Sequence, residues 1–141
     1  MRKVLINTDV LLDFFFDRKP FSEDACQILS LCENRKITAF ITSVMLSNIY
    51  YLLRKTAKHE KVIDHLKILL SLTDVLKTDK EAVLRALDSD FKDFEDALQN
   101  FSAQSYQEIN VIITRNVKDY KTSQLSVMTP ENYLKTFNSI I

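Results

Sequence analysis

Polar side chains suited to binding a metal ion follow three predicted strands of this sequence, near the point where each strand ends. They are Asn7, Thr8 and Asp9 after residues 4–6, Thr42, Ser43 and Asn48 after residues 37–41, and Thr114, Asn116 and Asp119 after residues 112–113. Asp93, Glu95 and Asp96 open a predicted helix just before the last of these strands. Because carboxylates gathered at one edge repel each other, the usual resolution is a hard cation such as Mg²⁺ or Mn²⁺. Such an ion can polarise a phosphodiester and activate an attacking water, and the pattern by itself indicates an acidic metal site.

Each of these residues also has a structural explanation that the sequence leaves open. Asp93 with Asp96 is typical of a capping pair at a helix N-terminus, where negative charge also complements the helix dipole. Asp9 is suited in the same way to cap the first helix. Asn48 has apolar neighbours and is suited to a hydrogen-bonded core amide, and Asp119 is suited to a solvated loop.

Alternating strands and helices must position these side chains. Strands are predicted at residues 4–6, 37–41, 75–76, 110–113 and 127–128, with helices around 10–15, 22–32, 43–55, 60–72, 79–87, 93–101 and from Pro130. The candidate helix caps are Ser22, Thr42 or Ser43, Asp79 and Thr129. This alternation predicts a parallel sheet covered by helices. In such sheets the ligand site lies beyond the carboxyl ends of the strands, where the polar residues collect.

Composition narrows the function classes further. The chain has 141 residues, of which 46% are hydrophobic and 27% charged, and this predicts one globular domain over residues 1–141. It contains no glycine, which disfavours the phosphate-cradling loops of nucleotide-binding proteins. The formal net charge is +0, so any polyanion must be met by a local patch. No apolar run approaches a membrane span and the N-terminus lacks the features of a signal peptide, so the protein is predicted to be cytoplasmic without membrane contact.

Four ordered segments resemble the motifs of the PIN-domain family. Residues 4–13, VLINTDVLLD, resemble its opening motif, usually written hydrophobic-Asp-Thr-Asn-Val-hydrophobic, and residues 43–51, 93–99 and 112–120 resemble its second, third and fourth motifs. The resemblance extends over nearly the whole chain and is strongest for the bacterial single-domain branch that includes VapC-type toxins. It implies an α/β protein with a three-layer α/β/α, PIN-like architecture and a central parallel sheet of about four to five strands.

The resemblance implies roles for individual residues. Asp96 and Asp119 match the acids of the third and fourth motifs, and Thr114 matches a small hydroxyl residue that shapes the same site. The predicted catalytic residues are Asp9, Asp96, Asp119, Asn7 and Asn48, and the predicted metal ligands are Asp9, Asp96, Asp119 and Asp93.

Two motifs depart from the family pattern. Asn7 stands where the first-motif Asp is expected, Asp9 stands where that motif usually has Asn, and Asn48 stands where many members have Glu. An amide supplies a neutral oxygen where a carboxylate supplies a negative one, so these exchanges lower the ligand charge on which Mg²⁺ affinity depends. Asp93 and Glu95 are placed to supply the missing charge.

Two functions follow from the resemblance. The first is a ribonuclease dependent on Mg²⁺ or Mn²⁺ that hydrolyses RNA phosphodiesters, as the toxin of a pair with an antitoxin protein, and commonly a homodimer. The second is a PIN-fold module that binds RNA or a protein partner without cleaving RNA.

An RNA substrate requires cations around the acidic site, because phosphates are held mainly by Lys and Arg. The predicted substrate-binding residues are Thr114, Arg115, Asn116, Lys118 and Arg54, and further candidates are Lys55, Lys58 and Lys121. Tyr50 and Tyr51 are candidates for stacking on bases, although helix packing is the favoured use of at least one of them.

Overall fold

The fold is taken from a computed structural model that describes residues 2–140. The described residues form five strands, β1 (Arg2–Ile6), β2 (Ile37–Thr42), β3 (Asp74–Leu76), β4 (Val111–Ile113) and β5 (Ser126–Met128). The helices are α1 (Thr8–Phe15), α2 (Ser22–Glu33), α3 (Ser43–Leu53), α4 (His59–Leu72), α5 (Lys80–Leu87), α6 (Phe94–Ser105) and α7 (Pro130–Ile140), and a short 3-10 helix covers Val117–Tyr120. Each predicted strand and helix is present, with ends that shift by a few residues. The 3-10 helix was not predicted.

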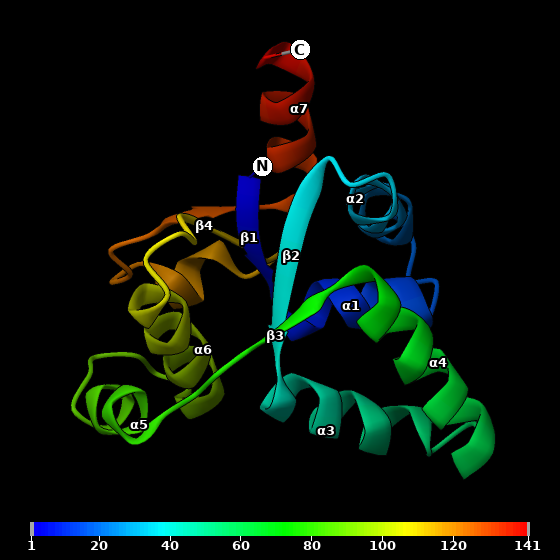
Figure 1. Cartoon of the computed structure of the whole chain (residues 1–141), viewed down its shortest axis with the longest axis horizontal. Coiled ribbons are helices and arrows are strands. Elements are labelled where there is room, and N and C mark those ends of the chain that lie inside the picture. Colours follow the sequence, from blue (N-terminus) through cyan, green and yellow to red (C-terminus); the bar gives the residue numbers. More distant parts are fainter. Residues whose placement is uncertain (1, 141) are drawn as a thin grey trace.

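The five strands form one sheet in the order β3-β2-β1-β4-β5, and all four pairings are parallel. The predicted parallel sheet is therefore confirmed. In Figure 1, α5 and α6 lie on one side of the strands, and α1, α2 and α4 lie on the other. This arrangement confirms the three-layer α/β/α prediction.

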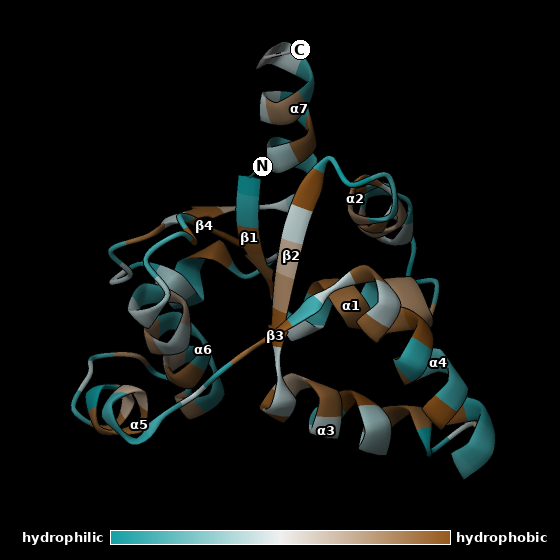
Figure 2. Cartoon of the chain, in the orientation of Figure 1, coloured by the Kyte–Doolittle hydropathy of each residue, from teal (hydrophilic) through white to brown (hydrophobic). Residues whose placement is uncertain are grey.

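The core forms where the apolar strand residues meet the apolar faces of the helices. Leu5, Ile6, Ile41, Ile112 and Ile113 are completely buried in the sheet. Figure 2 shows β1 changing from hydrophilic at its N-terminal end to hydrophobic at its carboxyl end, which is where it enters the core. Among the described residues, no helix combines the length and apolar character needed to cross a membrane.

Most helix starts agree with the predicted caps. The side chains of Thr42, Asp79 and Thr129 each accept a hydrogen bond from the backbone N–H three residues later. Ser22 does not act as a cap, because the chain already has helical backbone at Phe21 and Ser22 is itself the first residue of α2. The serine hydroxyl is therefore displaced from the position where it would accept from the helix N-terminus.

The register between β1 and β4 brings the first and fourth motifs together. Ile6 pairs with Ile113, and the backbone N–H of Asn7 donates to the carbonyl of Ile113 at 2.9 Å. Asn7 and Thr114 therefore leave the sheet side by side at its carboxyl edge. The site described below is built on this edge.

Candidate active site

Asn7, Thr114 and Asp9 form a hydrogen-bonded chain at the carboxyl ends of β1 and β4. The Asn7 amide is buried and donates to the Thr114 hydroxyl at 3.1 Å. That hydroxyl donates in turn to the Asp9 carboxylate, with its Oγ1 at 3.1 Å from Oδ2. The structure thus brings together three of the predicted site residues. Position 7 is Asn where the family's first motif has Asp, and its side-chain amide provides the N–H donor that begins this chain of hydrogen bonds.

The Asp9 carboxylate is held by protein donors on several sides. It accepts from the backbone N–H groups of Arg115 at 2.9 Å and Val10 at 2.8 Å, besides the Thr114 hydroxyl. Burial raises the pKa of Asp9, while the hydrogen bonds from Arg115, Thr114 and Val10 lower it and leave a net increase. Asp9 thereby ties the start of α1 to the loop after β4, which is a positioning role as well as a source of charge.

Asp96 carries the strongest electrostatic signal of the site. Burial, together with the neighbouring charges of Asp93, Asp119 and Glu95, raises its pKa to about 7, against a hydrogen bond from Tyr120 that lowers it. The Asp93 carboxylate caps α6 by accepting from the Asp96 N–H at 2.9 Å. Three carboxylates that disfavour ionisation of a fourth mark a position where a cation would be stabilised.

Tyr120 links Asp96 to the amides of Asn7 and Gln99, and the sequence did not single it out as a site residue. Its fully buried hydroxyl lies 3.2 Å from Asn7 Oδ1, 3.2 Å from Asp96 Oδ1 and 3.1 Å from Gln99 Oε1. A single phenolic proton serves one acceptor at a time, so the three acceptors share it. Burial and the Asp96 charge both raise the pKa of Tyr120, which keeps it protonated as a donor. The available signal was its place directly after Asp119 in the fourth motif.

Glu95 supplies a carboxylate beside Asn48. Asn48 Nδ2 donates to Glu95 Oε1 at 2.5 Å, and the other carboxylate oxygen accepts from Thr8 at 3.0 Å and from Gln99 at 2.8 Å. Asn48 lies on α3, and Glu95 lies on α6. The carboxylate at this position of the site therefore comes from α6, while α3 contributes the neutral amide of Asn48.

The 3-10 helix Val117–Tyr120 presents Asp119 to solvent. Asn116, Lys118 and Asp119 are all exposed, and the charge of Asp119 acts on Asp96 by raising its pKa. The Asn116 N–H donates to the Thr114 hydroxyl at 3.1 Å, which anchors the start of this turn to the chain of hydrogen bonds described above. A carboxylate and a cation thus lie next to each other at the open side of the site.

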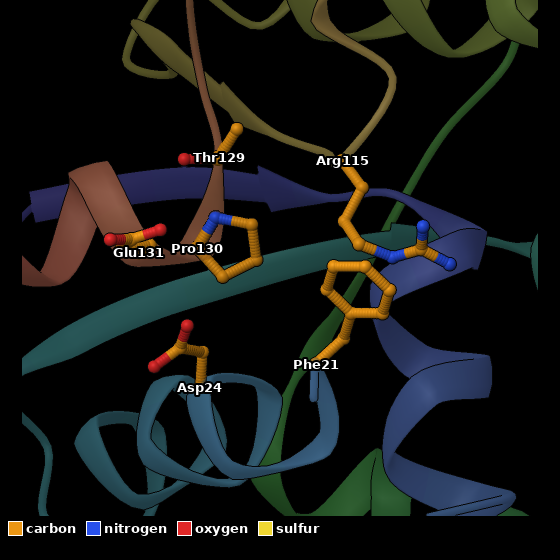
Figure 3. Close-up of a pocket in the computed structure, with 6 residues that line it drawn as sticks. All are labelled: Phe21, Asp24, Arg115, Thr129, Pro130 and Glu131. Carbon is orange, nitrogen blue, oxygen red and sulfur yellow. The ribbon is translucent and has the colours of Figure 1, made fainter. Parts of the chain in front are cut away.

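The guanidinium of Arg115 is engaged with the protein. It donates to both oxygens of Asp13 at 2.6 and 3.0 Å, and Asp13 is only 1% exposed. Figure 3 shows the side chain extending over the ring of Phe21, whose centroid is 4.0 Å from the guanidinium carbon. Arg115 also forms part of the wall of a cavity of about 230 Å³ with Thr129 and Pro130. These contacts favour a structural role over the predicted contact with substrate.

The Arg54 side chain is turned toward the backbone at the C-terminal end of α3. Its guanidinium donates to the carbonyl of Ala57 at 3.0 Å, just past the end of the helix. This contact favours a role in ending the helix over the predicted contact with substrate.

The donor set was compared with the requirements of a divalent ion. Within residues 2–140, no group of three His, Cys, Asp or Glu side chains is arranged to hold a metal ion. The oxygens at the site are nevertheless of the hard carboxylate and amide type that Mg²⁺ and Mn²⁺ prefer. Asp96 and Asp119 also interact electrostatically. The chemistry of these donors therefore fits such an ion, and Asp96, Asp119 and the side-chain oxygen of Asn7 are the candidates to hold it.

Known proteins were compared with the chain. The PIN domain model matches residues 3–118. Ribonuclease VapC1 of Aquifex aeolicus (strain VF5) is 25% identical over 143 residues, which cover 98% of this chain and 97% of that protein.

Solved structures of similar shape include toxin–antitoxin complexes. A chain of VapBC-1 from nontypeable Haemophilus influenzae has a TM-score of 0.67 at 14% identity, covering 93% of this chain and 99% of its own. A chain of DNA-bound VapBC from Salmonella typhimurium has a TM-score of 0.65 at 19% identity, covering 91% of this chain and 97% of its own. These likenesses establish the fold. Together with the family match over most of the chain, they lead to one conclusion: the chain belongs to the PIN-domain family.

Proposed function

We propose that this protein is a ribonuclease dependent on Mg²⁺ or Mn²⁺ that hydrolyses RNA phosphodiesters, as the toxin of a toxin–antitoxin pair. The observation that carries the proposal is Asp96, a carboxyl group whose pKa is raised to about 7 by burial and by surrounding carboxylates. A divalent ion relieves this repulsion, and the same ion can activate the water that hydrolyses a phosphodiester. The ribonuclease name of the Aquifex relative agrees with this chemistry.

The chain's own residues have distinct tasks in this proposal. Asp96 and Asp119 would hold the ion, with Asn7 Oδ1 as a neutral ligand, and the ion would supply an activated water and offset charge on the phosphate. Asp9 and Asp93 act mainly by position, since one holds the loop after β4 and the other caps α6. Thr114 fixes the Asn7 amide. Asn116 and Lys118 are exposed beside Asp119 and are proposed to contact RNA phosphates.

Cleavage of a mixed RNA pool tests the proposal. The wild-type protein is expected to cut RNA with Mg²⁺ or Mn²⁺ and not with EDTA, and Asp119→Asn is expected to lower the rate at least tenfold by removing one ligand charge. Asp74→Asn is the matched control, because Asp74 is an exposed acid in β3 and takes no part in the contacts of the site. RNA cleavage that persists in EDTA would contradict the metal-dependent mechanism.

The second function, binding without cleavage, is favoured by a specific observation. No three acidic side chains in the described part of the chain are arranged as metal ligands, and Asn7 and Asn48 are amides. If the protein binds RNA or a partner but no divalent ion restores cleavage of the pool, this second function replaces the first.

The effect of Asn7→Asp on thermal stability and on Mn²⁺ binding distinguishes the metal-dependent ribonuclease from the protein that binds without cleavage. The change removes the N–H that donates to Thr114 and adds a charge near Asp9 and Asp96, so the metal-free variant is expected to melt several degrees below wild type. Mn²⁺ is expected to restore its melting temperature and to bind about tenfold more tightly than to wild type. Thermal denaturation and calorimetric titration measure both effects. A variant that melts like wild type and ignores Mn²⁺ would remove position 7 from the ligand set.

An antitoxin protein and a homodimer are the proposed partners. The names of the similar structures describe VapBC assemblies and support the first proposal. Expression of this chain alone is expected to stop growth, and co-expression with its antitoxin to restore it. Light scattering of the purified protein measures the oligomeric state, and a monomer at all concentrations would contradict the dimer.

A further inference from the structure

A second cavity lies against the acidic site along α3. Its volume is about 380 Å³, and it is lined by Thr8, Asn48, Tyr51, Leu52, Lys55 and Glu95. Glu95 hydrogen-bonds both Thr8 and Asn48, so these three residues belong to the acidic site and to the cavity at once. Whatever occupies the cavity is therefore in contact with the proposed reaction site.

The wall of the cavity on the α3 side combines polar, aromatic and cationic side chains. Asn48 and Tyr51 are spaced i and i+3 on α3, so they lie on the same side of the helix, and Lys55 follows two residues after the end of α3. The cavity therefore brings an exposed aromatic ring and a cation together beside the Glu95 carboxylate.

Tyr51 is exposed and held in orientation. It is 67% exposed, and its ring makes an edge contact with Tyr50 at 5.0 Å between centroids. Tyr50 is fixed in turn by a hydrogen bond of 2.8 Å between its hydroxyl and His59 Nδ1. A large aromatic surface left in water on a supported ring is suited to stacking on a flat apolar partner.

Lys55 is the cation of this surface. It makes no ion pair with any side chain in the described residues, whereas Arg54 beside it donates to the carbonyl of Ala57 and does not line the cavity. The other charged residue of the lining is Glu95, whose two oxygens already accept hydrogen bonds from Asn48, Thr8 and Gln99. Because the Lys55 ammonium forms no ion pair with Glu95 or another described acid, the end of the cavity at Lys55 complements an anion such as a phosphate.

We propose that this cavity binds one nucleotide of single-stranded RNA next to the bond that is cut, with its base stacked on Tyr51 and its phosphate at Lys55. The inference rests on the proposed function, because it places the nucleotide beside the acidic site. It goes further in assigning a substrate subsite to α3. A stacking ring accepts any base, so this subsite contributes affinity with little sequence preference.

Binding of fluorescently labelled oligo(A) and oligo(U) RNA in EDTA at low salt tests the subsite without cleavage. Tyr51→Ala is expected to weaken binding about tenfold, and Tyr51→Phe is expected to bind like wild type because the ring remains. Lys55→Ala is expected to lower the slope of log K against log salt by about 0.7, as for one lost phosphate contact with a single strand. Lys36→Ala is the matched control and is expected to leave the slope unchanged, because Lys36 is exposed directly before the N-terminal end of β2, at the edge of the sheet opposite the site.

A tryptophan reporter tests the stacking directly. The chain has no tryptophan, so Tyr51→Trp introduces a single indole into the cavity, and its fluorescence is expected to be quenched on addition of either RNA. Leu87→Trp is the control, because Leu87 is 66% exposed on α5 and does not line the cavity. Equal quenching in both variants, or none in Tyr51→Trp, would overturn the proposal.

The outcomes for the subsite and for the enzyme are distinguishable. RNA cleavage by wild type with unchanged affinity and KM in Tyr51→Ala and Lys55→Ala overturns the subsite and leaves the ribonuclease intact. Tyr51-dependent binding without metal-dependent cleavage supports the subsite and overturns the ribonuclease. The subsite is overturned if the wild-type protein binds no RNA. It is also overturned if Tyr51→Ala binds a protein partner more weakly while its affinity for RNA is unchanged, because the cavity then binds the protein partner and not RNA.

Discussion

Asp96→Asn is expected to reduce metal-dependent RNA cleavage about 1000-fold while raising the stability of the metal-free protein at pH 8. The rate falls because the substitution replaces a proposed metal-binding carboxylate, on which the charges of three neighbouring carboxylates act, with a neutral amide. The stability rises because asparagine has no ionised form, yet its oxygen still accepts the hydrogen bond from Tyr120. Cleavage rates and thermal denaturation on the same protein samples measure the two effects.

The sign of the stability change follows from proton linkage. An unfolded Asp has a pKa of about 3.9, and the pKa of Asp96 in the folded protein is raised to about 7, so the folded state binds more protons between these values. The stability of wild type contributed by this group therefore falls as pH rises from about 4 to about 7 and stays lower above. Because Asp96 is partly exposed, solvent screening reduces the effect to about 1 kcal/mol, or about 3 °C in melting temperature at pH 8.

Two controls make this result specific. Asp74→Asn changes an exposed acid on β3 and is expected to alter neither the rate nor the pH profile. Mn²⁺ is expected to stabilise wild type above pH 7 more than it stabilises Asp96→Asn, because it binds the ionised carboxylate. An unchanged cleavage rate in Asp96→Asn, or a pH profile identical to wild type, would remove Asp96 from the centre of the site.

Arg115→Ala is expected to destabilise the protein by about 3 kcal/mol, or about 10 °C in melting temperature. The change leaves the Asp13 carboxylate, which is 1% exposed, with only the partly exposed Arg18 at 3.7 Å. An uncompensated buried charge costs more than the ion pair contributed, since the desolvation of the remaining carboxylate is no longer offset. Denaturant unfolding of wild type and variant measures the difference.

Companion variants separate a structural role of Arg115 from contact with RNA. Arg115→Lys is expected to be intermediate in stability, because an ammonium cannot repeat the two parallel hydrogen bonds to Asp13. Asp13→Asn in the Arg115→Ala background is expected to regain about half of the loss by removing the buried charge. Lys118→Ala changes an exposed cation and is expected to leave the melting temperature unchanged while weakening RNA binding. A stable Arg115→Ala variant that loses RNA affinity would restore the role predicted from the sequence.

The order of elements and the chain's place in the PIN family were predictable because their signals are local. Residues 4–6 and 112–113 are continuous apolar runs, which are typical of buried parallel strands. In the predicted helices between them, apolar residues recur at the spacing of a helix. Asp79 and Thr129 were predictable as caps because a cap requires only one side chain and a backbone N–H three residues later. Ser22 was not, since the local backbone had already turned helical at Phe21.

The division of labour among the polar residues was decided only by the tertiary structure. Sequence identified Asp9, Asp96 and Arg115 as polar groups near one edge, but not that Arg115 binds Asp13, 102 residues away, or that Tyr120 joins Asn7 to Asp96. Such pairings depend on the register of β1 against β4 and on how α6 packs across the sheet, and no spacing along the chain encodes either. The sequence by itself therefore determined which elements form and which side chains reach the carboxyl edge of the sheet. Tertiary packing decided which of these side chains are engaged in hydrogen bonds and ion pairs within the protein and which remain available for metal and RNA.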